Sequence, residues 1–142
     1  MNCILFGHAD VLNLNTDRLK KEILMLWQKY HDVEFLVGNN GSFDYACQKV
    51  LEETRREVQN LSYTIVLSRI NEIPLNSRSE SSIFPEELST ALPRFAISKR
   101  NNWMIKRADF AICYVSRITS NSYKIFNKLS RKGISVINLV DL

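Results

Sequence analysis

Short apolar runs alternate with longer segments of helical periodicity, and this alternation constrains the fold more than any other feature of the sequence. The apolar runs lack a clear two-residue period, which is typical of strands that helices cover on both faces. Strands joined through helices pair in parallel. The pattern therefore predicts an α/β fold, namely a three-layer Rossmann-like domain with a mainly parallel sheet of about five strands. The predicted strands are Cys3–Phe6, Glu34–Val37, Tyr63–Leu67, Phe110–Val115 and Val136–Val140.

Four helices are predicted between these runs. Thr16 and Asp17 are typical of a helix start, and Gly133 is typical of a helix end. The helices are expected at about 16–30, 42–58, 95–107 and 122–132. On the second helix we expect four charged residues to face water: Glu52, Glu53, Arg55 and Arg56.

A polar segment rich in Ser and Asn runs from Ser68 to about Pro93. Loops of this length inside a compact domain are usually functional or mobile. The segment could belong to the ligand site or to an interface, and the sequence does not distinguish between them.

Length and charge limit the classes of function. The 142 residues are enough for a single domain, 1–142, with a substantial core. There are 19 Lys and Arg against 15 Asp and Glu, so the net charge is +4 and the pI is near 9.1. This excess suits an anionic ligand but is too small to indicate nucleic acid, which is not expected as a partner.

The cysteines and the apolar runs indicate a cellular location. Cys3, Cys47 and Cys113 lie in apolar runs without metal-ligand spacing, as reduced and buried thiols of a cytosolic protein do. The apolar runs are too short to span a membrane, and the N-terminus lacks the basic flank and cleavage site of a signal peptide. We therefore expect a cytoplasmic protein with no membrane contact, no cofactor and no metal ion.

The first candidate motif is FGHAD, residues 6–10, directly after the first predicted strand. Gly7 permits a sharp turn or a close approach of the backbone to a ligand. His8 could bind a ligand, act as an acid or base, or only stabilise the turn. Asp10 could equally be solvated.

The second motif is GNNGSFD, residues 38–44, which holds two of the four glycines. It is neither a P-loop nor a GxGxxG fingerprint. Gly38, Asn39 and Gly41 lie where a strand leads into a helix, at the edge where open parallel sheets bind ligands. Unpaired N–H groups at a helix start favour an anion there. Asp44 could accept a hydrogen bond from a sugar hydroxyl, or only stabilise the helix dipole.

The third motif is PRFAISKRNNWMIKRADF, residues 93–110, the densest basic stretch of the chain. On a helix, Arg100 shares one face with Trp103 and Arg107, while Asn101 and Met104 share another. Arg100 and Asn101 could bind a phosphate and a base or ribose. The alternative is a solvated basic face above a core stripe.

The fourth motif is RITSNSYK, residues 117–124, after the fourth predicted strand. Ser120, Asn121 and Ser122 precede the last helix, whose N-terminus suits an anion. Ser122 as a plain helix cap is the alternative.

Taken together, four stretches resemble the small bacterial members of the SLOG superfamily: FGHAD, FLVGNNGSFD, PRFAISKRNNWMI and ADFAICYV. These are Rossmann-like nucleotide-ligand domains related to the Lonely Guy phosphoribohydrolases and to the DNA processing protein DprA. The resemblance covers nearly the whole chain, and PRFAISKRNNWMI is its most specific part. It implies a nucleotide-derived ligand and a homodimer or higher homo-oligomer.

The resemblance also implies site residues. It places Gly7 and His8 on a first ligand loop. It places Gly38, Asn39, Gly41 and Asp44 on a second loop, and Arg100 and Asn101 on a helix that faces the pocket.

One departure from these relatives bears on catalysis. The relatives carry a Gly-Gly-Ala or Gly-Gly-Thr phosphate loop after the fourth strand, and the hydrolases add a glutamate farther along the helix. Here that stretch reads Thr119-Ser120-Asn121-Ser122, and no Asp or Glu occurs between Asp109 and Asp141. The catalytic carboxylate therefore has no clear counterpart.

We accordingly expect a protein that senses or sequesters a nucleotide or nucleotide-derived small molecule at the carboxyl edge of the sheet, without catalysis. The alternative is a nucleotide N-glycosidic hydrolase of the phosphoribohydrolase kind. It would need His8, Asp10 or Asp44 as its acid, base or charge-stabilising group.

Overall fold

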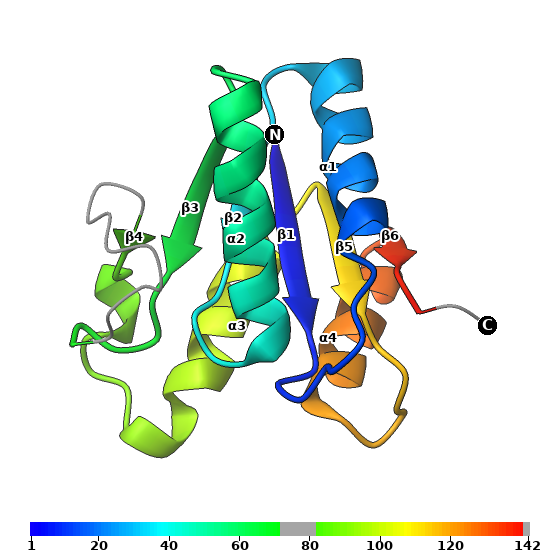
Figure 1. Ribbon diagram of the computed structural model, residues 1–142. Helices are drawn as coiled ribbons and strands as arrows, with labels where there is room; N and C mark the ends of the chain where they lie inside the picture. The colour runs from blue at the N-terminus through cyan, green and yellow to red at the C-terminus, as the bar shows by residue number, and fades with distance from the viewer. Residues whose placement is uncertain (72–81, 141–142) are drawn as a thin grey trace.

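A computed structural model describes residues 1–71 and 82–140 and contains a single six-stranded sheet (Figure 1). All five strand pairs are parallel. The strands follow the order β4-β3-β2-β1-β5-β6 across the sheet. Their bounds are β1 Asn2–Gly7, β2 Glu34–Val37, β3 Ser62–Val66, β4 Ser82–Ile83, β5 Phe110–Tyr114 and β6 Ser135–Asn138.

The sheet has one strand more than the expected five. β4 pairs Ser82 and Ile83 with Ile65 and Val66 of β3 at the edge of the sheet. Two residues are too few to produce a periodic pattern, so the sequence gives no sign of this strand. The other five strands lie within one or two residues of their expected bounds.

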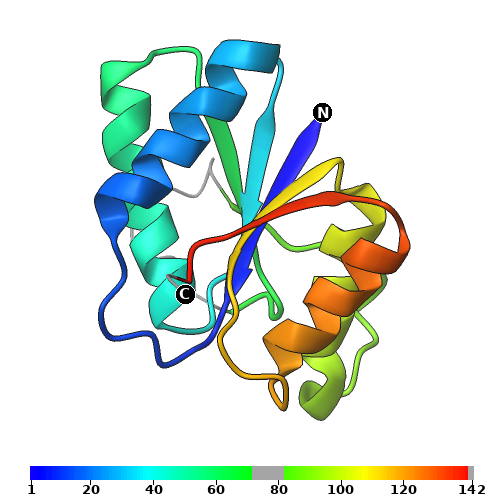
Figure 2. The ribbon, with the colours of Figure 1, turned by 90° about the vertical axis from the view of Figure 1, so that its right-hand side faces the viewer.

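Two helices cover each face of the sheet, which makes three layers (Figures 1 and 2). The helices α1 (Thr16–Tyr30) and α2 (Ser42–Glu57) lie on one face, and α3 (Ala96–Arg107) and α4 (Asn121–Arg131) lie on the other. Short 3₁₀ turns at Glu86–Leu88 and Pro93–Phe95 lead into α3. The expected three-layer, Rossmann-like α/β fold is confirmed.

Helix caps explain where α1 and α4 begin. The side chain of Asn15 accepts a hydrogen bond from the Arg18 N–H and caps α1. The Ser120 hydroxyl accepts from the Tyr123 N–H and caps α4. The cap of α4 is therefore Ser120, and the alternative role of Ser122 as that cap is wrong.

The inner strands β1, β2 and β5 are buried on both faces, which accounts for their weak two-residue period. In β1, Cys3 and Leu5 belong to the core under α1 and α2, whereas Ile4 and Phe6 belong to the core under α3 and α4. All four residues are at most 5% exposed. Continuous apolar character in a strand is what two covered faces require.

Glu52 is buried, and the expectation that it faces water is wrong. The Tyr63 hydroxyl, from β3, donates a 2.7 Å hydrogen bond to its Oε2, and Arg55 Nη2 donates to its Oε1 at 2.8 Å. Burial raises the pKa of Glu52, but the bonds from Tyr63 and Arg55 outweigh it and lower this pKa below its ordinary value. Glu53 is exposed as expected.

The three cysteines are buried and unpaired, as expected. Burial raises the pKa of all three thiols, which keeps them protonated. None of the described helices combines the length and apolar character that a membrane crossing needs.

The segment expected as a long loop, Ser68–Pro93, can be followed only in part. Residues 72–81 lie outside the described residues. The remainder contains β4, the turn Glu86–Leu88 and the beginning of the turn Pro93–Phe95.

Candidate functional site

A cleft of about 400 Å³ opens at the carboxyl edge of the sheet. Its walls come from the loops after β1, β2 and β5, from one side of α3 and from the start of α4. The chain runs outwards from β1 through β2 to β4 in one direction and from β5 to β6 in the other, so the order reverses beside β1. Open α/β sheets bind ligands at such a reversal, where neighbouring loops diverge to opposite faces.

Nine of the eleven residues singled out from the sequence line this cleft: Gly7, His8, Gly38, Asp44, Arg100, Asn101, Ser120, Asn121 and Ser122. Asn39 and Gly41 are not among its lining residues. The fold thus brings together motifs that lie far apart in the sequence.

His8 is buried and holds the loops after β1 and β5 together. Its ring Nε2 accepts a 2.8 Å hydrogen bond from the Ser116 N–H, and its backbone N–H donates to the Tyr114 carbonyl at 3.3 Å. An Nε2 that accepts from an N–H carries no proton, so the neutral ring is protonated at Nδ1. Burial and the nearby Arg117 charge lower the pKa of His8, although Asp10 raises it.

This hydrogen bond restricts the chemistry of His8. A general base needs a free ring lone pair, but Nε2 already uses its lone pair on Ser116 and Nδ1 bears the proton. His8 is 4% exposed and lines the cleft, and no described residue accepts a hydrogen bond from Nδ1. His8 is therefore arranged as a neutral hydrogen-bond donor.

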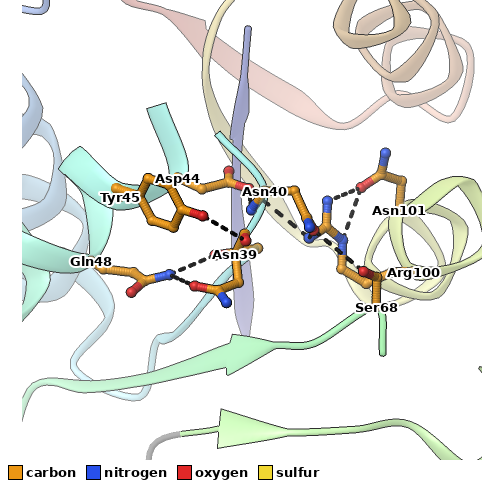
Figure 3. Close-up of polar contacts among 9 residues, drawn as sticks. Asn39, Asn40, Asp44, Tyr45, Gln48, Ser68, Arg100 and Asn101 are labelled. Atoms are coloured by element: carbon orange, nitrogen blue, oxygen red, sulfur yellow. Dashed lines mark hydrogen bonds and ion pairs between the residues drawn. The ribbon is translucent and has the colours of Figure 1, made fainter. Parts of the chain in front are cut away.

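Arg100 reaches from α3 to the loop after β2 and forms the centre of a polar network (Figure 3). Nη1 donates to Asn40 Oδ1 at 2.6 Å, while Nε and Nη2 donate to Asn101 Oδ1 at 3.2 and 2.8 Å. Nη1 lies 4.0 Å from Asp44 Oδ2, so the two buried charges compensate each other. Asp44 Oδ2 also accepts from the Asn40 N–H at 2.9 Å.

The side chain of Arg100 thus points to the cleft side of α3 and away from Arg107. Arg100 is 5% exposed, whereas Arg107 is exposed on the outer face and lies over the Trp103 ring. A long side chain can leave the helix face on which its Cα lies. Helical spacing describes only the Cα positions, so it places Arg100 on the same face as Arg107 although the Arg100 guanidinium lies on the cleft side.

Gly38 and Gly7 make room for side chains of the protein itself. A Cβ at Gly38 would lie 2.6 Å from the Arg100 Cζ and 2.7 Å from Asp44 Oδ2. A Cβ at Gly7 would lie 2.6 Å from the Phe43 ring. At both positions, side chains of α2 and α3 therefore occupy the space that the missing glycine side chain leaves.

Gly41 joins the first two loops. Its φ of 142° disfavours a side chain, and a Cβ there would lie 2.6 Å from the Ala9 Cα. The next residue, Ser42, donates its N–H to the Ala9 carbonyl at 2.9 Å. The Ser42 N–H is one of the donors at the start of α2 that were expected to bind an anion. It is used within the protein instead.

Asn39 is held on the far side of the loop after β2 by α2 (Figure 3). Gln48 Nε2 donates to Asn39 Oδ1 at 2.8 Å and to the Gly38 carbonyl at 2.9 Å. The Tyr45 hydroxyl donates to the Asn39 carbonyl at 3.3 Å. Gln48 is completely buried, and it fixes the shape of the loop rather than lining the cleft.

The start of α4 forms the other end of the cleft. Ser122 is 8% exposed and lines the cleft, and its hydroxyl bonds to no described residue. Arg117, in the loop after β5, lines the same cleft. The dipole of α4 is positive here, so this end of the cleft is suited to an anion.

Asp10 and Arg117 form an exposed ion pair at the mouth of the cleft. Arg117 Nη2 lies 2.7 Å from Asp10 Oδ1, and Nη1 lies 3.4 Å from Oδ2. The hydrogen bond from Arg117 holds the pKa of Asp10 below its ordinary value, so this carboxylate is ionised. The pair bridges the loops after β1 and β5.

Sequence reasoning missed several residues of the site. Asn40 and Arg117 lie inside motifs that were identified, and their amide and guanidinium groups were the available signal. Ile97, Met104 and Ile125 form apolar parts of the wall. Helical spacing groups Met104 with Asn101, but nothing local distinguishes a core residue from one that lines a cleft.

No protein-family model matches this chain, and no curated protein matches it either.

Proposed function

We propose that the protein binds a nucleotide or nucleotide-derived small molecule in this cleft and performs no chemistry on it. The proposal agrees with what the resemblance to SLOG proteins implies. The observation that carries it is that two mostly buried residues, His8 and Ser122, line the same cleft as the start of α4, and that the His8 Nδ1–H and the Ser122 hydroxyl bond to no described residue.

The end of the cleft at α4 suits a phosphate. Helix N–H groups, the His8 Nδ1–H and the Ser122 hydroxyl would donate to its oxygens, and Arg117 would supply the opposite charge. Both donors belong to residues that line the cleft, so a ligand or water there can accept hydrogen bonds from them.

The remainder of the cleft suits a flat polar ring or a sugar. Ile97, Met104 and Ile125 supply apolar surface, while Asn40 and Asn101 supply amide groups at its edge. Ligand sites generally combine a mostly apolar wall with a few fixed polar groups. A volume of about 400 Å³ lies within the range of small-molecule sites, roughly 300 to 1,000 Å³.

The arrangement of the titratable groups favours binding over catalysis. His8 has no available base lone pair. Asp44 accepts from the Asn40 N–H and lies beside Arg100. A hydrolase would need a carboxylate placed at the glycosidic bond and a group to transfer a proton.

Calorimetric titration with adenosine and guanosine monophosphates, diphosphates and ADP-ribose tests the proposal. We expect at least one of these phosphorylated ligands to bind. Free adenosine and guanosine, titrated in the same way, should not bind. Arg117→Gln should weaken this binding about tenfold, the usual effect of losing one charge-assisted bond of about 1.4 kcal/mol. Arg94→Gln is the matched control, because Arg94 is exposed and does not line the cleft. Absence of binding across the panel would contradict the proposal.

An N-glycosidic hydrolase is the second candidate, and Asp10 is the observation in its favour. Asp10 lines the cleft as an ionised carboxylate, which could stabilise an oxocarbenium-like centre. Chromatography of the same mixtures after incubation distinguishes the candidates. Release of a free base, lost in Asp10→Asn, would establish the hydrolase.

A further inference from the structure

The C-terminal third of the chain, which contains α3 and α4, carries far more positive charge than the composition of the whole chain suggests. Residues 94–142 contain ten Lys and Arg and two acidic residues, Asp109 and Asp141. Residues 1–93 contain nine Lys and Arg but thirteen Asp and Glu. The net charge of +4 averages these unlike parts, and the expectation against nucleic acid rests on that average.

Two shallow hollows lie side by side on the outer surface of α3 and α4. Their volumes are about 320 and 420 Å³, and they share Asn102 and Lys106. Neither has a lining residue in common with the cleft. Six cationic residues line them: Lys99, Lys106, Arg107, Lys128, Arg131 and Lys132. Among their described lining residues, Glu87 is the one carboxylate. We call this surface the α3–α4 basic face.

The basic face lacks the apolar anchors that a protein partner or a membrane uses. In α3 beyond Ile97, and throughout α4, no large apolar side chain is exposed. Protein interfaces draw most of their binding energy from a few buried aromatic or Arg anchors in pockets, and surface helices bind membranes by inserting apolar side chains. Leu88, Trp103 and Ile105 line the hollows but are not exposed, so the exposed groups of this face are mainly cations, which match a phosphate backbone.

Trp103 does not provide a stacking surface for unpaired bases. The Arg107 guanidinium carbon lies 3.7 Å from the centre of the Trp103 ring, and Arg107 Nη1 donates to the Trp103 carbonyl at 3.0 Å. Trp103 also packs against the core under α3 and α4. Single-strand binders rely on accessible aromatic faces, whereas sequence-independent binding of a duplex needs only contacts to its phosphates.

We propose that the α3–α4 basic face binds the backbone of duplex nucleic acid without regard to base sequence. The 12 residues of α3 span about 18 Å, which corresponds to roughly five base-pair steps. Lys and Arg on this face displace counterions condensed on the duplex, so affinity falls steeply as salt rises. The cleft is a separate surface, and its ligand does not compete with the duplex.

Fluorescence anisotropy of a labelled 20-base-pair duplex, titrated with the full chain at several salt concentrations, tests this proposal. We expect the logarithm of the association constant to fall with the logarithm of salt with a slope of about −3 to −5. Lys99→Gln/Lys106→Gln/Arg131→Gln should weaken binding at least about 30-fold at low salt and reduce the slope by about 2 to 3. These three side chains are exposed, so the variant should fold, as circular dichroism would verify.

The matched control is Lys21→Gln/Lys29→Gln/Lys49→Gln, which removes the same charge from exposed positions of α1 and α2. It should leave the slope unchanged and weaken binding less than about threefold. Equal weakening by both triple variants would refute the proposal, because the attraction would then follow net charge alone. A slope near zero, or binding to anionic lipid vesicles but not to the duplex, would refute it as well. Lysine acetylation of the unmutated protein supplies an independent readout, since the duplex should protect Lys99 and Lys106 and leave Lys21 reactive.

Discussion

The Arg100 guanidinium occupies the space that a side chain at position 38 would need. A Cβ on Gly38 would lie 2.6 Å from the Arg100 Cζ, and real Cβ atoms do not approach other atoms so closely. Gly38 and Arg100 come from opposite sides of the sheet edge, after β2 and within α3. The second glycine-rich loop is thus shaped around a buried cation.

Gly38→Ala should destabilise the protein by about 2 kcal/mol, the usual effect of overpacking a close contact. The strain should decrease in an Arg100→Ala background, because the guanidinium is then absent, and part of it should remain, because Asp44 Oδ2 would still lie 2.7 Å from the new Cβ. Urea unfolding of the two single variants and the double variant measures this coupling.

Gly133→Ala serves as the control for backbone effects. Its φ of 76° disfavours a side chain, but nothing lies within 4 Å of a Cβ there. Gly133→Ala should lower the free energy of unfolding by about 1 kcal/mol through backbone strain alone, whether residue 100 is Arg or Ala. Equal coupling of both glycines to Arg100 would contradict the packing explanation.

Arg100→Ala should destabilise the protein by about 3 kcal/mol, because it leaves the buried Asp44 carboxylate without its compensating charge. Arg107→Ala removes the same charge from the exposed end of α3 and should cost about 1 kcal/mol or less. Thermal unfolding compares the two. Similar losses would mean that the Arg100 network contributes little to stability.

The hydrogen bond from Tyr63 to Glu52 should stabilise the protein by about 2 kcal/mol, as bonds to buried charged groups do. Tyr63→Phe should lose this amount, whereas Tyr30→Phe should lose little, since the Tyr30 hydroxyl bonds to no described residue. The pKa of Glu52 should rise in Tyr63→Phe, which carboxyl NMR titration would detect. An unchanged Glu52 pKa would contradict this assignment.

His8 should make stability depend on pH below neutrality. Its pKa is lowered in the folded protein, so the unfolded chain binds the proton first as the pH falls below the ordinary value of 6.5. The contribution of His8 is complete above pH 6.5 and is lost progressively as the pH falls to its folded-state pKa. Urea unfolding of the native protein and of His8→Gln between pH 7.5 and 5 measures it.

His8→Gln can retain an acceptor for the Ser116 N–H but does not titrate. The native protein should therefore lose stability relative to His8→Gln as the pH falls through this range. Parallel curves would show that His8 keeps its ordinary pKa.

The sequence predicts the main elements of this fold well because their signals are local. The strand Glu34–Val37, for example, follows from a short apolar run. Such a run is needed because helices cover both faces of the sheet. Glu52 shows the limit of such reasoning. Its burial depends on Tyr63, which only the pairing of β3 with β2 brings beneath α2.

The position of the cleft was predictable for a similar reason, because loops after parallel strands meet at one edge of the sheet. The side-chain contacts within it were not. Whether Gly38 faces a ligand or Arg100 depends on a contact between two distant segments. The same holds for the bond between His8 and Ser116, which fixes the tautomer of the imidazole.

NMR titration with phosphorylated nucleotides tests the proposed binding site most directly. A bound ligand should shift the amide signals of Asn121 and Ser122 and slow the exchange of the His8 Nδ1 proton. The signals of Lys21 and Lys29, on α1, should stay in place. Shifts confined to residues outside the cleft, or no shift with any of these nucleotides, would contradict the assignment of this cleft as the nucleotide site.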